Sequence, residues 1–200
     1  MSQGFDETSP SLLERAKGDD PEAWQRLVRI YGPLVYGWAR KAGLQPSDAS
    51  DVVQEVFVSV ARGLGRFRKV DAGDSFKGWL WTVCRNKIRD HARRAEEAAA
   101  AGGTTAHLMI QGLPESPAGE GSEEGHAESQ LVRLNALLEY RNAFESQVWD
   151  AFWRVAVEQR APADVARELG VSVWAVYKAR SRVVQRLRRE LDGLVVPEAS

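Results

Sequence analysis

The chain has 200 residues, a formal net charge of −1 and a single cysteine. Hydrophobic residues make up 44% of it, which is enough for a core and excludes a chain that is disordered throughout. One cysteine excludes a disulfide framework, and the sequence contains neither zinc-site spacing nor an apolar run near the roughly 18 residues of a membrane helix. The polar, acidic start is unlike a signal peptide, so we expect a cytoplasmic protein without metal or cofactor.

The near-zero net charge hides an uneven distribution along the chain. Residues 62–94 hold 10 basic and 3 acidic side chains, a net charge of +7, and residues 160–190 hold 8 and 3, a net charge of +5. Between them, residues 95–130 hold 7 acidic side chains and no basic one. Two basic blocks on either side of an acidic segment indicate two polyanion-binding surfaces on separate domains.

The first clear element is a helix that begins at Asp20, an N-cap residue followed by a proline and an acid. Apolar residues recur at helical spacing from Trp24 to Trp38, and Gly43 ends the helix. Pro46 begins the next one. The sequence has neither the alternation of strands nor hairpin dipeptides, so the predicted fold class is all-α.

The helix after Pro46 has an acidic face. Its valines and Phe57 form an apolar stripe, and Asp51, Gln54 and Glu55 share the opposite face at i, i+3 and i+4. Such a face suits a partner that offers Arg and Lys, because a carboxylate accepts two hydrogen bonds from one guanidinium. Taken alone, however, the motif favours an ordinary solvated helix face.

Residues 62–94 combine basic side chains with aromatic ones. Charges attract phosphates, rings stack on unpaired bases, and Asn is a good reader of base edges. A helix that begins near Ser75 is expected to turn one apolar side to the core: Phe76, Leu80, Val83 and Ile88. Arg85, Asn86 and Arg89 then project outward, and Cys84 is expected to be a small buried residue. The alternative is that the aromatic residues are core and the charges a solvated face; this segment alone does not decide.

Residues 95–130 are rich in Glu, Gly and Ala and have almost no large apolar side chains. Burial therefore cannot offset the entropy of ordering them, and we expect a flexible linker. One hypothesis is that its acids screen the basic domains from each other when nothing else is bound. A plain solvated tether is the simpler expectation.

Residues 162–182 have the layout of a helix-turn-helix. A short helix begins at Pro162, Gly170 supplies the left-handed residue at its end, and Ser172 caps the next helix. Six basic residues and no acidic one lie between Ser172 and Arg189, so the second helix is suited to a major groove. Its predicted core-facing residues are Val173, Val176, Arg180, Val183 and Leu187. The predicted outer face carries Trp174, Lys178, Ser181, Arg182, Gln185 and Arg189.

In this order, the three motifs resemble those of bacterial RNA polymerase sigma factors of the sigma-70 family, in the two-domain ECF (extracytoplasmic function) group. The stretch 51–57 resembles region 2.2, which docks on the coiled coil of the polymerase β′ subunit. The stretch 76–94 resembles regions 2.3 and 2.4, which melt and read the −10 element. The segment 134–191 resembles region 4, whose helix-turn-helix reads the −35 element.

The resemblance implies two small helical domains, 11–94 and 131–192, joined by the flexible linker 95–130. It also implies a promoter-specificity factor that is not an enzyme. Its expected partners are core RNA polymerase (the β′ coiled coil and the β flap) and promoter DNA, with an anti-sigma protein as a further candidate, but neither a membrane nor a small-molecule substrate. Trp174, Ala175 and Tyr177 stand where family members often have a basic residue or Thr, which leaves the −35 sequence preference open.

The roles implied by the resemblance fall into three sets. The residues expected to bind core polymerase are Asp51, Gln54 and Glu55. Those expected at the −10 element are Lys69, Ser75, Trp79, Trp81, Arg85, Asn86 and Lys87, of which the two tryptophans either support the melted edge or simply pack. Those expected at the −35 element are Ser172, Trp174, Lys178, Ser181 and Arg182.

Two other classes of function compete with this interpretation. A stand-alone helix-turn-helix regulator with an N-terminal sensor domain explains residues 131–191 but not the basic and aromatic block 62–94. An enzyme would need a phosphate loop, a nucleophile elbow or a metal-ligand cluster, and the sequence has none of these motifs.

Overall fold

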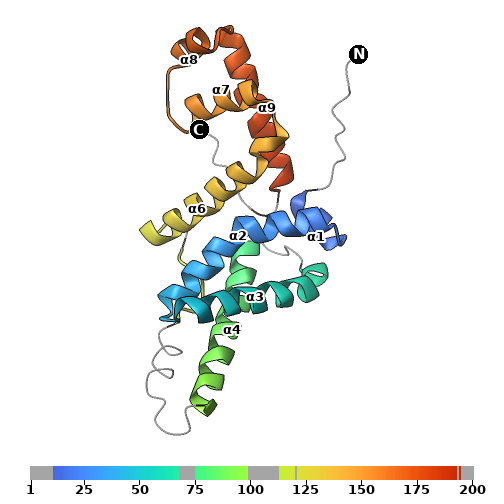
Figure 1. Cartoon of the computed structure of the whole chain (residues 1–200), viewed down its shortest axis with the longest axis vertical. Coiled ribbons are helices and arrows are strands. Elements are labelled where there is room, and N and C mark those ends of the chain that lie inside the picture. The colour runs from blue at the N-terminus through green and yellow to red at the C-terminus, as the bar shows by residue number, and fades with distance from the viewer. Residues whose placement is uncertain (1–10, 68–74, 99–112, 120, 193, 195–200) are drawn as a thin grey trace.

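The computed structural model describes residues 11–67, 75–98, 113–119, 121–192 and 194. Its helices there are α1 Leu12–Lys17, α2 Pro21–Lys41, α3 Pro46–Gly63, α4 Phe76–Ala98, α6 Glu123–Tyr140, α7 Ser146–Ala156, α8 Pro162–Leu169 and α9 Val173–Glu190 (Figure 1). Two short 3-10 turns, η1 Leu64–Arg66 and η2 Arg141–Ala143, follow α3 and α6. The described residues contain no strand, which confirms the all-α prediction. None of the described helices combines the length and apolarity needed to cross a membrane.

The predicted start of α2 is confirmed at the level of single hydrogen bonds. The Asp20 carboxylate accepts from the backbone N–H groups of Glu22 at 2.9 Å and Ala23 at 3.2 Å, and Pro21 is the first helical residue. These contacts satisfy donors that have no partner inside the helix. Gly43, with φ of 91°, follows the helix in a left-handed conformation, and Pro46 begins α3 as expected.

Helices α2, α3 and α4 pack around one end of the core. The apolar stripe of α3 is buried through Val52, Val56 and Phe57, and α4 buries Phe76, Leu80 and Ile88 as predicted. Cys84 is fully buried as well, and its burial raises the pKa of the thiol to about 12. The thiol therefore stays protonated and packs as a small apolar group.

The helix-turn-helix is formed as predicted. Helix α8 ends at Gly170, whose φ of 66° is left-handed, and the Ser172 hydroxyl accepts from the Ala175 backbone N–H at 3.1 Å. Buried Val165, Ala166 and Val176 pack the two helices together against α7. The turn and this packing thus fix the orientation of α9 relative to α7 and α8.

The buried side of α9 differs from the prediction at its start. The buried row is Val176, Ala179, Val183 and Leu187, whereas Val173 is 40% exposed and Arg180 is exposed. Side chains of a helix lean toward its N-terminus, so the side chain of the first residue extends beyond the helix rather than onto its neighbours. The outer face is exposed as predicted, except that Arg189 is partly buried.

Helix α6 joins the two halves of the molecule. It lies along α2, and the C-terminal end of α9 reaches α1 (Figure 1). One continuous core runs from Leu12 through both halves to Leu194. The Tyr31 hydroxyl of α2 also donates to the Leu194 carbonyl oxygen at 2.8 Å. The two predicted domains therefore pack against each other in this structure.

The segment expected to be a linker is helical at both of its ends. Helix α4 continues to Ala98, and α6 begins at Glu123 with the Ser122 hydroxyl as its cap. Gly125 allows α6 to approach residues 118–119, since a Cβ there would lie 1.9 Å from the Gly119 carbonyl oxygen. Residues 99–112, which form the middle of the expected linker, lie outside the described residues.

Candidate partner and nucleic-acid interfaces

The acidic face of α3 already holds a guanidinium. Asp51 and Gln54 are exposed, while Glu55 accepts two hydrogen bonds from Arg94 Nη2 of α4, at 2.8 and 3.1 Å. The two side chains of this pair are 35% and 53% exposed, so the ion pair is worth about 0–1 kcal/mol. The face can therefore accept an arginine, and an outside arginine can replace the internal one at little cost.

The basic face of α4 starts from a defined cap. The Ser75 hydroxyl accepts from the Gly78 backbone N–H at 3.0 Å, which assigns this predicted −10 residue a structural role. Asn86 is exposed and Arg85 and Lys87 are half-buried. Lys69, the remaining charged residue of the predicted set, lies outside the described residues.

The aromatic residues of this block pack against one another. Trp81 is 4% exposed, and its ring meets that of Trp38 edge-on with a centroid distance of 5.1 Å. Trp79 is partly buried, and its ring centroid lies 5.1 Å from that of Phe67 and 5.8 Å from that of Phe76. Of the two roles considered for these tryptophans, packing is the one that their surroundings provide. Their contact with DNA stays a prediction.

Lys77, a member of the basic block without an assigned role, meets a buried carboxylate. Its Nζ lies 2.7 Å from Glu128 Oε2, and Trp38 Nε1 donates to Glu128 Oε1 at 2.6 Å. Glu128 is only 5% exposed, in a segment expected to be a solvated linker. Its burial could not be foreseen, because Trp38 is 90 residues away in the sequence.

The outer face of α9 presents the predicted −35 set. Trp174 is 69% exposed, and Lys178 Nζ lies 4.9 Å above the centroid of its ring. Lys178, Ser181 and Arg182 are exposed, as is Ser172 at the cap. The four exposed side chains after the cap share one side of the helix, so a single groove could receive them together.

Sequence comparisons agree with this order of elements. Residues 27–97 match the model of sigma-70 region 2. The RNA polymerase sigma factor CnrH of Cupriavidus metallidurans is 26% identical over 91% of the chain and 93% of its own length. The ECF RNA polymerase sigma factor BldN of Streptomyces coelicolor is 26% identical over 90% of the chain and 64% of its own length. Residues 27–97 thus match a sigma-70 region 2, and along about nine tenths of its length the chain is similar to ECF RNA polymerase sigma factors.

Two further matches are more limited: one covers less than half of the chain, and one is a solved structure that superposes poorly on it. The RNA polymerase sigma factor NccH of Alcaligenes xylosoxydans xylosoxydans is 34% identical over 43% of this chain and 47% of its own length. A solved structure of CnrH in complex with the cytosolic domain of CnrY covers 90% of this chain and 95% of its own, with 22% identity and a TM-score of 0.35.

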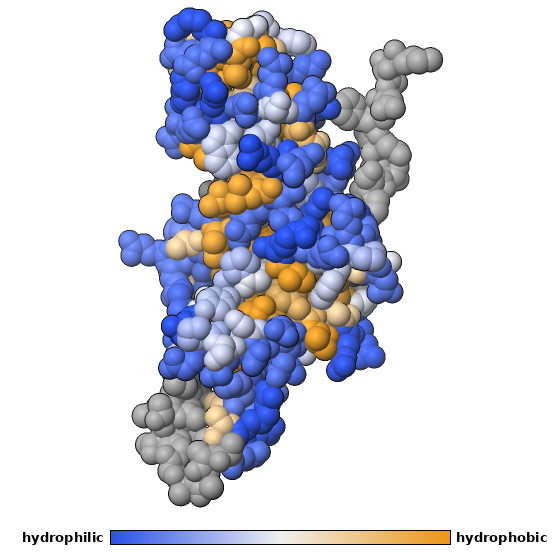
Figure 2. Space-filling model, in the orientation of Figure 1, coloured by the Kyte–Doolittle hydropathy of each residue, from blue (hydrophilic) through white to orange (hydrophobic). Residues whose placement is uncertain are grey.

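The chain has a further surface that the sequence motifs did not reveal. Leu131, Leu134 and Leu138 of α6 are 37%, 43% and 52% exposed, and apolar surface lies over α6 in Figure 2. The i, i+3, i+7 spacing of these leucines is the signal that could have identified the row. The acidic residues before this row and the narrow buried face of α6 weaken the amphipathic pattern around it.

Proposed function

We propose that this chain is a sigma factor, which binds core RNA polymerase and directs it to promoters by recognising −10 and −35 elements. The observation that supports this most is the presence of two separate basic helices on one chain. Helix α9 is presented by a helix-turn-helix, and α4 has its own basic face with exposed Asn86. A factor that only binds duplex DNA through a helix-turn-helix has no need for the second surface.

Docking on polymerase is assigned to two surfaces. The acidic face of α3, with Asp51, Gln54 and Glu55, suits the β′ coiled coil through its ability to hold an arginine. The β flap is the proposed partner of residues 131–192, and the exposed leucines of α6 are an apolar surface available for it. Polymerase, rather than the linker, then sets the distance between the two DNA-reading helices, α4 and α9.

The proposed division of labour is 11–94 for polymerase docking and the −10 element, 95–130 as a connection, and 131–192 for the −35 element. Each half alone binds weakly, and the connection makes the second contact effectively intramolecular. Such a factor works in the cytoplasm, where polymerase is, and transforms no substrate itself. A separate anti-sigma protein is a further proposed partner.

The rival function is a stand-alone helix-turn-helix regulator, and promoter binding separates the two. Fragments of genomic DNA are equilibrated with the chain, with core polymerase and with both, and the bound sequences are determined. The sigma function predicts sequence-specific binding only when both are present. Tight and specific binding by the isolated chain would show that it is a regulator instead.

A further inference from the structure

The recognition helix α9 begins with large apolar side chains that are exposed to solvent. Trp174 is 69% exposed, Tyr177 53% and Val173 40%. Trp174 and Tyr177 are three residues apart and so lie side by side on the outer face of the helix. The Lys178 ammonium over the Trp174 ring holds the indole on this face.

The charge around these rings limits what can cover them. Between Ser172 and Arg189, α9 has six basic residues and no acidic one, so its partner is a polyanion. In the major groove the apolar group at a base edge is the C5-methyl of thymine, whereas the other edge groups are hydrogen-bond donors or acceptors. An exposed indole and phenol ring therefore match thymine better than any other base.

We propose that Trp174 and Tyr177 select thymines in the −35 element by packing against their C5-methyl groups. This inference rests on the proposed function and adds the base chemistry of its −35 reader. It makes Tyr177 a specificity residue that the motif pattern did not assign. Burying one methyl group contributes about a fourfold change in affinity.

Deoxyuracil, which lacks only the methyl group, tests the proposal. The probe is a promoter fragment identified by start-site mapping, with each −35 thymine replaced in turn, and the dissociation constant is measured for the complex of the chain with core polymerase. We expect binding about fourfold weaker for each contacted methyl lost. The W174A/Y177A double variant should bind thymine and uracil equally at every −35 position, whereas Q185A, a change at another exposed α9 position, should keep the wild-type ratio.

The proposal is overturned if wild-type protein binds both fragments equally, if the aromatic variants keep the wild-type ratio, or if the mapped −35 element has no thymine. In each of these cases the start sites mapped with wild-type protein still support the sigma function. Failure to find any start site would instead contradict the proposed function itself.

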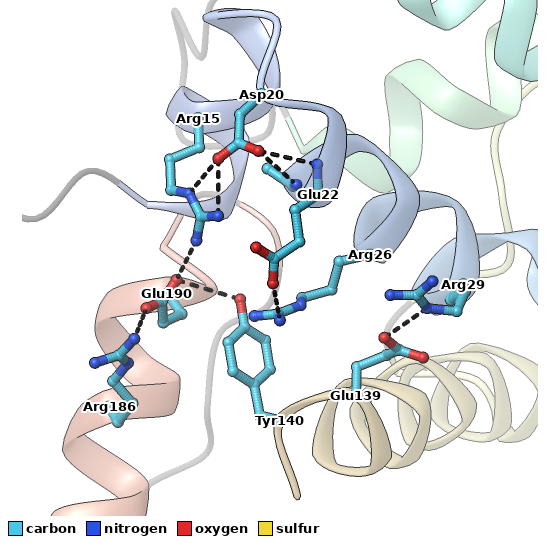
Figure 3. Close-up of polar contacts among 10 residues, drawn as sticks. Arg15, Asp20, Glu22, Arg26, Arg29, Glu139, Tyr140, Arg186 and Glu190 are labelled. Carbon is cyan, nitrogen blue, oxygen red and sulfur yellow. Dashed lines mark hydrogen bonds and ion pairs between the residues drawn. The ribbon is translucent and has the colours of Figure 1, made fainter. Parts of the chain in front are cut away.

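A second inference comes from the polar contacts between the two halves of the chain. Glu128 of α6 is buried against Lys77 and Trp38, as described above. Glu190, at the end of α9, is 3% exposed and lies 3.8 Å from Arg15 Nη1 of α1. It also accepts from the Tyr140 hydroxyl at 3.3 Å and pairs with Arg186 at 2.8 Å (Figure 3).

These contacts limit the distance between the two DNA readers. From Glu128 to Tyr140, and from Glu190 back to Lys178, each helix rises about 18 Å. Even with the side-chain links fully extended, Lys77 and Lys178 lie within roughly 65 Å of each other along this path, and Asn86, nine residues further along α4, lies within roughly 80 Å of Lys178. The −10 and −35 elements are about 25 base pairs apart, which is about 85 Å on straight B-DNA.

We infer that the described arrangement is a closed form, latched by Glu128 and Glu190, that must open before both promoter elements are bound. The inference rests on the proposed function for its DNA spacing. Closure also keeps Lys77 of the basic block paired with an acid of the expected linker. An acid of the expected linker, Glu128, thus pairs with a specific basic residue, Lys77, rather than only screening the basic surfaces.

Fluorescence energy transfer between dyes on S47C and S146C reports opening, because both serines are exposed and the native Cys84 is buried. We expect lower transfer efficiency in E128Q/E190Q than in wild type at unchanged helical content by circular dichroism. The E124Q control breaks only an exposed pair with Lys41 and should leave transfer unchanged.

Addition of core polymerase and promoter to the labelled wild-type chain should lower the transfer as well. Equal transfer in wild type and E128Q/E190Q, or unchanged transfer in a polymerase complex that initiates correctly, overturns the latch. If E128Q/E190Q loses its helical content, transfer in the single variants E128Q and E190Q decides: the latch requires a lower transfer efficiency in each of these proteins that stays folded.

Discussion

Glu55 has two competing partners in the proposed account. In the free chain it holds Arg94 through two hydrogen bonds, and at the polymerase it would hold an arginine of the partner. Because the internal pair is partly solvated, its loss costs little and the exchange is close to neutral. The neighbouring Asp51 and Gln54 are exposed and complete the docking face.

Removal of the two carboxylates tests this face. The D51A/E55A variant should lose most of its initiation with core polymerase while its free energy of unfolding changes by no more than about 1 kcal/mol. Run-off transcription and urea denaturation measure the two effects. The matched control E115A/E158A removes two exposed acids elsewhere and should initiate normally. Unchanged initiation by D51A/E55A would remove these residues from the docking role.

Single residues were predictable where their partners are local. The acidic face of α3 and the exposed face of α9 follow from spacing within one helix. Glu128 and Glu190 were not predictable as buried groups, because their partners come from other elements: the Tyr140–Glu190 contact spans 50 residues and Trp38–Glu128 spans 90. The packing of Trp81 against Trp38 depends on the same distant pairing of helices.

Whole elements were predictable where a cap or a turn marks them. Asp20, Pro46, Gly170 and Ser172 all stand at the boundaries that the sequence indicated. Helix α6 was missed at its start because Glu, Gly and Ala dominate residues 118–128 and little there can be buried locally. Its first turns are instead held by a capping serine and by distant cations.

The turn of the helix-turn-helix predicts a specific backbone cost. Gly170 has a left-handed φ of 66°, and a Cβ there would meet nothing within 4 Å. The G170A variant should therefore lose roughly 1 kcal/mol of unfolding free energy through backbone strain alone. Urea denaturation measures the loss, and stability equal to or above that of wild type would contradict the assigned turn geometry.

The cap of α2 predicts a dependence of stability on pH. The backbone N–H of Ala23 and the Arg15 guanidinium lower the pKa of Asp20 below its ordinary 3.8. A carboxyl with a lowered folded pKa stabilises the fold above its unfolded pKa, and this contribution is lost as pH falls through the folded value. The stability gap between wild type and D20N should thus be full well above pH 3.8 and should close as the pH falls below the lowered folded pKa of Asp20.

Thermal unfolding across this pH range measures the gap. Asn is also a good N-cap, so D20N isolates the charge from the cap hydrogen bonds. A gap that stays constant with pH would mean that the Asp20 carboxylate contributes no charge-dependent stability.

At the scale of the whole molecule, the net charge of −1 is a sum over parts that meet different partners. The basic face of α4 and the basic helix α9 belong to different halves of the molecule, and Glu128 of α6 contacts the α2–α4 side through Lys77 and Trp38. The same acidic segment that cancels the charge therefore also holds the two halves together. Composition could indicate two polyanion-binding surfaces, but their closed arrangement depends on long-range pairs.

Run-off transcription on fragmented genomic DNA tests the central claim most directly. Core polymerase is assayed alone, with the wild-type chain and with the K178A/R182A variant, which lacks two charged side chains of the outer face of α9. The account predicts new, discrete start sites with shared sequences near −10 and −35 only when the wild-type chain is present, and a strong loss of these products with K178A/R182A. The same start sites with and without the chain would contradict it.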